Sequence, residues 1–469
     1  MRSGYVKPPS ILAAAVGALR RLPLERAIRV AIPVTIVLVA LGSNWSPRVR
    51  SLAQPLWRVS LVGLCGLAVA WALTYAGPRL LASRLRAPAY AATVAFAALA
   101  AASTLWSVDP RLTLERTFSF VLVLATGAAL ALGAGRNPGT IERLVGSVLA
   151  GAVAVALAGL AVLAVVPHDA LQTATQTIPT RYRGIGQNPN TDAMLFAAAL
   201  PLATWVVVAE RGRARLAGTL ALLLLAGSIV ASGSRGALIT GALGTLALLL
   251  AIAGGTRARV LVTVGLVAAV AAAIGLAEIL QPNANATGAS PTACRTCRLN
   301  PNDADHWIRL EDDLDRPASA GGPAQRRTFL ASTGRGQAWE GAFDQAQARP
   351  VAGYGFGTED HVFVDRYYSF FGGSPENSYI GMFLQLGVAG VVLLIGLAAT
   401  LLAASVAALR RLGERERRIA AACAAALVTG LGLAVVQSSL YAVGNTATLA
   451  VWTCGFLGLA LASRPASGP

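Results

Sequence analysis

Arginines stand at several tight turns between the apolar segments of this chain. Arg235 lies in the turn Ser-Gly-Ser-Arg-Gly (232–236), and Arg335 opens a stretch in which Trp339 and Phe343 follow at helical spacing. A guanidinium held at such a turn can bind an anionic head group through two parallel hydrogen bonds. It can equally anchor a helix end at a membrane surface. The residues alone leave both interpretations open for Arg235.

A second arginine pair precedes another expected helix start. Arg181 and Arg183 are followed by Gln-Asn-Pro-Asn (187–190), a run that predicts a turn and then a helix with Asn190 as its N-cap. A cap accounts for the asparagine but not for the arginines. Substrate binding by Arg183 and Asn190 is therefore kept as an alternative to a purely structural turn.

Polar residues also open a later apolar segment, in Pro-Glu-Asn-Ser-Tyr (375–379). Glu376 and Asn377 are suited to capping the helix, because the helix dipole favours a carboxylate there. A carboxylate in a cleft at the membrane surface can also act as a general base. Asn377 and Tyr379 are candidates for substrate contact, and His361 is a candidate for contact or for an alternative base.

Other residues that could carry chemistry are interpreted more plainly. Gly-Tyr-Gly-Phe-Gly (353–357) is glycine-rich, but no strand–helix context supports a nucleotide site, so it predicts a tight turn. Cys294 and Cys297 could form a local disulfide or, with His306, part of a metal site that lacks further ligands. The acidic run 311–315 is expected to be solvated, with divalent-cation binding as the alternative. Three cysteines inside apolar runs are expected to pack there: Cys65, Cys423 and Cys454.

The elements that must position these residues are membrane helices. The chain has 469 residues, of which 55% are hydrophobic and only 13% charged, against about 25% charged in soluble domains. A bilayer span needs about 20 apolar residues. Twelve such segments predict an all-α polytopic integral membrane protein, the tenth being long enough to project or kink: 27–42, 57–76, 88–105, 117–134, 145–166, 190–209, 215–232, 236–253, 258–278, 377–408, 418–440 and 445–462.

Charge distribution predicts the orientation of these spans. Connections on one side are basic, for example Arg211, Arg213 and Arg215, and so is the N-terminal stretch, so this side is expected to be cytoplasmic. On the other side, segment 279–376 has nine arginines and twelve acidic residues, so its net charge is −3. Because the whole chain has a net charge of +17, the rest of the chain carries +20. Both termini are therefore expected inside and the large loop outside. No small-residue cleavage site follows the basic N-terminus, so a retained first span is expected.

Three regions follow from this orientation: a membrane region of about nine spans (1–278), the large extracytoplasmic loop (279–376) and a membrane region of about three spans (377–469). The formal charge of +17 does not indicate nucleic-acid binding, because the basic residues form short clusters between apolar runs. Charges inside the spans are almost absent, and no inverted repeat is visible. Both features argue against a transporter or flippase, which remains the alternative function.

The polar motifs, taken in order, resemble the O-antigen ligase and O-antigen polymerase superfamily, which are bacterial membrane glycosyltransferases of class C type. The resemblance covers roughly residues 100–410. It is carried by Leu-Trp-Ser-Val-Asp-Pro (105–110), Gly-Ile-Gly-Gln-Asn-Pro-Asn (184–190), Ser-Arg-Gly-Ala-Leu (234–238), Gly334-Arg335 with Trp339, Gly-Tyr-Gly-Phe-Gly-Thr (353–358), and Asn-Ser-Tyr (377–379) with Leu386-Gly387.

The resemblance implies transfer of a glycan from a polyprenyl pyrophosphate to an acceptor hydroxyl at the outer face of the bacterial plasma membrane. It also implies three partners, namely this lipid-linked donor, a glycan or lipid-glycan acceptor, and the bilayer. It implies neither a cofactor nor a metal. Arg235 and Arg335 match the arginines to which the family assigns stabilisation of the departing pyrophosphate. Family ligases have a histidine as base directly before the position of Asn377, where this chain has Glu376. That departure favours the polymerase type mildly over the ligase type.

Overall fold

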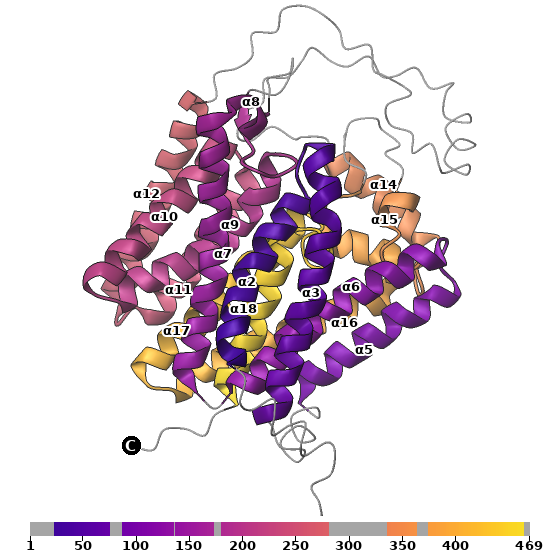
Figure 1. The fold of residues 1–469 in the computed structure, drawn as a ribbon, viewed down its shortest axis with the longest axis horizontal. Coiled ribbons are helices and arrows are strands. Elements are labelled where there is room, and N and C mark those ends of the chain that lie inside the picture. The colour runs from indigo at the N-terminus through magenta and orange to yellow at the C-terminus, as the bar shows by residue number, and fades with distance from the viewer. Residues whose placement is uncertain are drawn as a thin grey trace, which may run out of the picture.

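The computed structural model describes residues 23–75, 87–135, 137–172, 180–280, 335–363 and 374–463, and helices make up most of them (Figure 1). Two short strands, β1 (Leu171–Gln172) and β2 (Arg181–Tyr182), pair antiparallel. The helices are α2 (Leu24–Gly42), α3 (Pro47–Tyr75), α5 (Pro88–Ala102), η1 (Ser103–Leu105), α6 (Pro110–Ala134), α7 (Pro138–Val165), α8 (Pro167–Ala170), α9 (Pro189–Ala209), α10 (Gly212–Ser232), α11 (Arg235–Ile252), α12 (Thr256–Leu280), α14 (Arg335–Gln347), α15 (Glu359–Val362), α16 (Ser378–Arg411), α17 (Glu414–Val436) and α18 (Thr446–Ala462).

Ten of the described helices are long and apolar enough to cross a membrane. Two further helices coincide with expected spans: α2, which carries three charged residues in its first two turns, and α18, which has 17 residues. The prediction of an all-α polytopic membrane protein is confirmed. The count of twelve spans, their orientation and the three-region division remain predictions.

Several helices begin before the apolar run that predicted them. Helices α6 and α7 start at Pro110 and Pro138, about two turns ahead of the apolar residues, with proline in the first turn of each. Asp109 caps α6 by accepting a hydrogen bond from the backbone N–H of Leu112 at 3.0 Å. Polar residues thus extend these helices beyond the segment that hydropathy alone marks.

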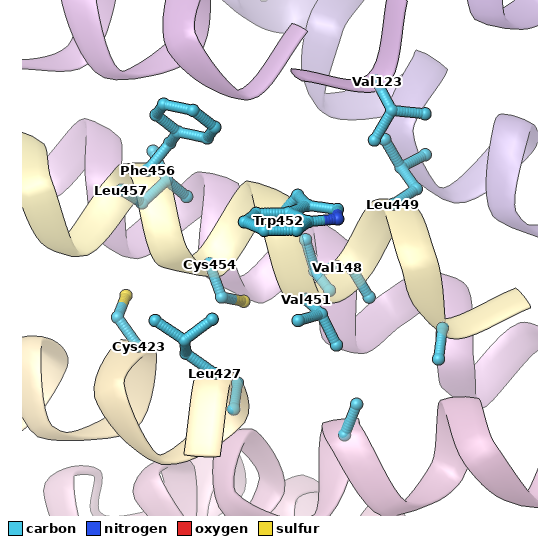
Figure 2. Packing of buried hydrophobic residues seen from close by; sticks show 14 of the residues in the cluster. Val123, Val148, Cys423, Leu427, Leu449, Val451, Trp452, Cys454, Phe456 and Leu457 are labelled. Carbon is cyan, nitrogen blue, oxygen red and sulfur yellow. The ribbon is translucent and has the colours of Figure 1, made fainter. Parts of the chain in front are cut away.

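Helices α17 and α18 pack in the centre of the bundle, where small and bulky side chains interlock (Figure 2). Trp452 of α18 is fully buried, and its indole N–H donates to the carbonyl of Leu440 at 2.6 Å. Cys423 and Cys454 are buried free cysteines close to it, and Cys65 is a third. The expectation that all three cysteines serve as packing residues is confirmed.

Helix α16 is broken at Gly387, whose backbone is left-handed (φ 63°). The segment before α15 lies against this break and bonds to the freed backbone groups. Tyr354 N–H donates to the carbonyl of Leu384 at 3.0 Å, Gly355 N–H to that of Gln385 at 2.8 Å, and Val388 N–H to that of Pro350 at 2.8 Å. The tenth apolar segment therefore kinks, and a stretch of the large loop is bonded into the kink.

The glycine-rich run 353–357 forms tight turns, as the sequence predicted. All three of its glycines have positive φ, and a Cβ on Gly353 would collide with the backbone carbonyl of Gln385. Phe356, which is 1% exposed, inserts from this run into the bundle between Phe96 and Phe120, with ring centroids 6.0 and 5.7 Å away. The glycines thus serve close packing and anchor the loop.

Some expectations concern residues beyond the described ranges. Cys294, Cys297, His306 and the acidic run 311–315 lie outside the described residues, so the disulfide, the metal alternative and the cation alternative stay predictions.

Candidate active site

Arg335 and Glu376 meet where the last part of the large loop returns to the membrane region. Arg335 is the first residue of α14, and its Nε and Nη2 donate to Oε2 of Glu376 at 3.1 and 2.5 Å. Both side chains are about one quarter exposed. Trp339, one turn further along α14, donates its indole N–H to the carbonyl of Pro375 at 2.8 Å and so docks α14 beside the carboxylate. Two residues predicted separately from the sequence are therefore in direct contact.

The backbone around Glu376 is held in an unusual conformation. Glu376 has φ 47°, the one positive value for a non-glycine residue in the described part of the chain. Asn377 follows as the N-cap of α16, and its Oδ1 accepts from the N–H groups of Tyr379 and Ile380 at 2.9 and 3.1 Å. The cap predicted for Asn377 is confirmed. It fixes the turn that places the Glu376 carboxylate next to the start of α16.

Gln437, in the connection between α17 and α18, completes the surroundings of the carboxylate. Its Nε2 donates to Oε2 of Glu376 at 3.1 Å, and its carbonyl accepts from the Ser378 hydroxyl at 2.8 Å. All three bonds to Glu376 end on Oε2, whereas Oε1 accepts none from the described residues. A carboxylate oxygen without such bonds can accept a proton from a hydroxyl group.

Arg235 brings the second positive charge to the same place. It begins α11 directly after Ser234, where Gly233 provides a left-handed turn (φ 58°). A small cavity of about 30 Å³ is lined by both Arg235 and Arg335, whose like charges are close enough to act on each other. This cavity is lined by Asn190, Met194, Ser234, Arg235, Gly236, Ala237, Arg335, Leu433, Val436 and Gln437.

Two guanidinium groups, those of Arg235 and Arg335, line this pocket, and Arg335 pairs with the carboxylate of Glu376. Guanidinium groups match phosphate oxygens with paired, charge-assisted hydrogen bonds. Two groups that can bind an anion therefore lie close to a carboxylate that can accept a proton.

Arg181 and Asn190 support the turn that carries Arg235. The buried Arg181 donates from Nε to the carbonyl of Ser232 at 2.7 Å and from Nη2 to Oδ1 of Asn190 at 3.1 Å. Asn190 itself lines the pocket, but it is not the N-cap of α9, as the sequence analysis expected. That role belongs to Asn188, whose Oδ1 accepts from the Asn190 N–H at 2.9 Å. The shift arises because Pro189 occupies the first helical position, which its fixed φ favours.

Three other predicted site residues are engaged elsewhere. Arg183 donates to the carbonyls of Asp169 and His168 at 2.9 and 3.0 Å and stacks over the ring of Trp45 at 4.1 Å. Tyr379 donates its hydroxyl to the carbonyl of Leu431 at 3.0 Å. None of the lining residues of the pocket is Arg183, His361 or Tyr379.

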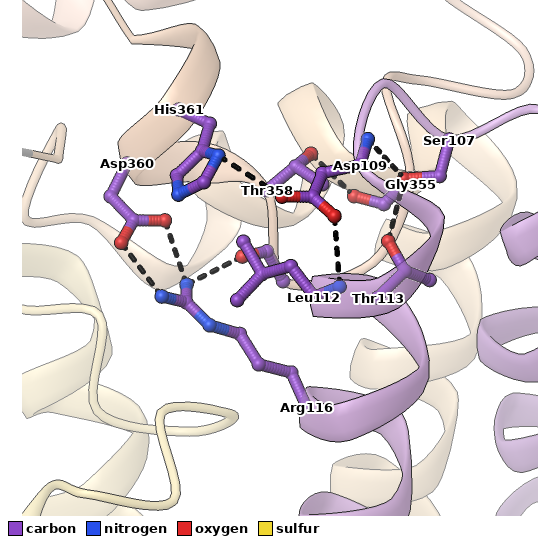
Figure 3. Close-up of polar contacts among 10 residues, drawn as sticks. Ser107, Asp109, Leu112, Thr113, Arg116, Gly355, Thr358, Asp360 and His361 are labelled. Atoms are coloured by element: carbon purple, nitrogen blue, oxygen red, sulfur yellow. Dashed lines mark hydrogen bonds and ion pairs between the residues drawn. The ribbon is translucent and has the colours of Figure 1, made fainter. Parts of the chain in front are cut away.

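His361 lies instead at the junction of the large loop with the turn before α6 (Figure 3). Its Nδ1 is 3.5 Å from Asp109 Oδ2, within the motif 105–110. Trp106 of that motif donates its indole N–H to the carbonyl of Ala352 at 2.9 Å, and Val108 N–H donates to that of Tyr354 at 3.0 Å. The motif thus docks the loop against α6. In the described ranges, no three His, Cys, Asp or Glu side chains gather as a metal site would need.

Comparison with known proteins gives a match for the part of the chain that carries the charged residues of this site. Residues 220–395 match the family model described as O-antigen ligase. The matched region runs from α10 into α16 and includes Arg235, Arg335 and Glu376. It confirms the resemblance to the O-antigen ligase and polymerase superfamily inferred from the motifs. No curated protein matches the chain.

Proposed function

We propose that this multi-pass membrane protein, whose residues 220–395 match O-antigen ligase, transfers a glycan from a polyprenyl pyrophosphate to an acceptor hydroxyl. We place the reaction at the outer face of the bacterial plasma membrane. The observation that carries the proposal is the pocket in which Arg235 and Arg335 lie beside the Glu376 carboxylate. A cofactor has no part in the proposed reaction.

The chemistry assigns one role to each charged group. The acceptor oxygen forms a bond to the anomeric carbon, and the bond from that carbon to the pyrophosphate oxygen breaks. The proton of the acceptor hydroxyl passes to Oε1 of Glu376, and the lipid pyrophosphate leaves with the bonding electron pair. Arg235 and Arg335 stabilise the negative charge that develops on the leaving group. Asn190, which also lines the pocket, is placed to contact the same substrate.

Replacing Arg235 or Arg335 by alanine tests the proposal. Loss of one such stabilising donor typically costs about 10²–10³ in rate, so each variant should produce almost no glycan product while staying in the membrane. Arg213→Ala, in the first turn of α10, is the matched control and should leave the glycan unchanged. Normal glycan in both pocket variants would refute the mechanism.

Glycan profiling of a deletion strain then separates the two reaction types. Surface glycan that stops at one repeat unit identifies a polymerase, whereas full-length glycan stranded on the lipid carrier identifies a ligase. Glu376 at the position of the family histidine favours the polymerase type. A strain in which glycan accumulates on the inner leaflet would instead indicate a flippase.

A further inference from the structure

A second, larger cavity of about 500 Å³ lies beside the candidate active site, in the range of about 300–1,000 Å³ typical of ligand sites. It is bounded by α3, α6, the turn before α15, α16 and the connection between α17 and α18. Its lining residues are Trp57, Arg58, Leu61, Val62, Leu112, Glu115, Arg116, Phe118, Ser119, Leu122, Phe356, Gly357, Glu359, Gln385, Tyr441, Ala442, Val443 and Gly444. Arg58 and Phe118 are exposed, so the cavity reaches the surface of the bundle.

Two charged residues that line this cavity, Arg116 and Glu115, are paired within the protein, and the exposed Arg58 lies over the ring of Trp57 at 5.8 Å. Arg116 is held by Asp360, with Nη1 to Oδ1 and Nη2 to Oδ2 both 2.7 Å, and Nη1 also donates to the Gly357 carbonyl at 2.5 Å (Figure 3). Glu115 pairs with Arg111 at 3.2 Å. The guanidinium of Arg116 therefore has its charge balanced within the protein.

A buried carboxyl group, that of Glu359, also disfavours a phosphate in this cavity. Glu359 is 6% exposed, and its Oε2 accepts from the Tyr441 hydroxyl at 2.5 Å and from Gln385 Nε2 at 3.2 Å. Burial raises the pKa of Glu359 to about 7. A phosphate nearby would make ionisation of this carboxyl still more costly. Carboxyl, amide and phenol groups are instead suited to exchanging hydrogen bonds with hydroxyl groups.

The walls of the cavity are aromatic and apolar, with Trp57, Phe118 and Phe356 among them. An apolar lining with a few convergent polar groups is the usual composition of a site for a small uncharged molecule. A polyprenyl tail would contact the apolar walls, but it has no group that exchanges hydrogen bonds with Glu359, Gln385 or Tyr441. A sugar presents both apolar C–H faces and hydroxyl groups, so it matches both parts of the lining.

The cavity is close to the candidate active site along the chain. Gln437 bonds to Glu376, and Tyr441 bonds to Glu359, so the two sites share one short connection. Four residue steps span at most about 14 Å. Leu440 N–H also donates to the Ser378 hydroxyl at 3.3 Å, which ties this connection to the start of α16. The two sites are therefore close to each other in space.

We propose that this second cavity binds the uncharged sugar end of the acceptor glycan, with Glu359, Gln385 and Tyr441 as its polar contacts. The inference rests on the proposed glycosyl transfer and adds where the acceptor binds. The pyrophosphate then occupies the pocket lined by Arg235 and Arg335, and the acceptor enters through the second cavity. The two cavities thus divide the two substrates between them.

Binding measurements with two probes test this division on the purified full chain in lipid nanodiscs. The probes are inorganic pyrophosphate and the oligosaccharide that mild acid releases from the lipid-linked glycan of a deletion strain. Glu359→Gln should weaken oligosaccharide binding about tenfold, the effect of losing about 1.4 kcal/mol, and leave pyrophosphate binding unchanged. Arg235→Ala should do the reverse. Ser119→Trp, which adds a bulky side chain to the lining of the cavity, should also weaken only oligosaccharide binding.

The outcomes separate the two proposals. Oligosaccharide binding that is absent, or equal in the wild type and both cavity variants, overturns the acceptor site. Pyrophosphate binding weakened by Glu359→Gln or Ser119→Trp also overturns it, because the cavity would then hold the donor. Pyrophosphate binding that does not depend on Arg235, together with no transfer by the wild type, refutes the glycosyl-transfer proposal itself.

Discussion

Replacing Glu376 by glutamine removes the charge and the proton acceptor but keeps the size of the side chain. A general base contributes about 10²–10⁴ in rate, or about 3–5 kcal/mol of barrier at 1.36 kcal/mol per factor of ten. The left-handed backbone at this position costs about 1–3 kcal/mol with either residue. The stability change therefore comes from the contacts with Arg335 and Gln437, and the loss of rate should far exceed it.

Glu376→His supplies the residue that family ligases have at this position. Histidine is enriched among non-glycine residues with positive φ, so the turn should accept it. Imidazole is in its basic form above its ordinary pKa of about 6.5. We expect Glu376→His to recover part of the rate lost in Glu376→Gln, and to recover more of it as the pH rises through that value.

The assay is the initial rate of transfer by purified protein in lipid vesicles, with lipid-linked glycan from the deletion strain as substrate. Glu142→Gln is the matched control, because Glu142 pairs with Arg415 at 2.7 Å at the other end of the bundle. A rate for Glu376→Gln within about threefold of the wild type, in protein that is folded, would show that Glu376 only anchors Arg335. The base in the proposed mechanism would then have to be another group.

Further predictions concern residues around the site. Arg183→Ala should lower the melting temperature, since charge-assisted hydrogen bonds are worth about 1.5–3 kcal/mol, and should leave the transfer rate within about threefold. Gly353→Ala should sharply reduce the yield of folded protein in detergent, whereas Gly336→Ala, where a Cβ meets open space, should not. Asn377→Ala should cost about 0.5–2 kcal/mol of stability through the lost cap, and Asn377→Asp should restore it. The wild type should gain thermal stability as the pH falls from about 7 towards 4.5, because folding raises the pKa of Glu359 and the folded state holds that proton more tightly; Glu359→Gln should lack this gain.

Local signals in the sequence were enough to locate much of the fold and part of the candidate site. Apolar runs identified the membrane helices, and the turn and cap residues identified Arg235 and Asn377 as helix-start positions. Arg335 and Glu376 were both singled out, yet their contact joins positions 41 residues apart and no pattern along the chain predicts it. The individual residues were therefore accessible from the sequence, whereas their arrangement was not.

Tertiary contacts decided the remaining cases. Gln437 follows an apolar helix like many other polar residues, and only its position opposite Glu376 gives it a role. Glu359 and Tyr441 form a hydrogen bond although 82 residues separate them in the sequence. Arg183 was predicted to contact substrate from its residue type alone, but nearby carbonyls and Trp45 take up its guanidinium. Competition from neighbouring backbone groups cannot be seen in a linear sequence.

The bonding of segment 350–355 to the break at Gly387 bears on how substrate range could be exchanged between such enzymes. If a large loop from another protein were grafted and the graft ended before α16, its counterpart of segment 350–355 would have to bond to the native carbonyls of Leu384 and Gln385. The smallest unit that keeps those bonds runs from about residue 350 to residue 388. Exchanges of loop specificity should therefore carry the first three turns of α16 with them, as one inseparable module.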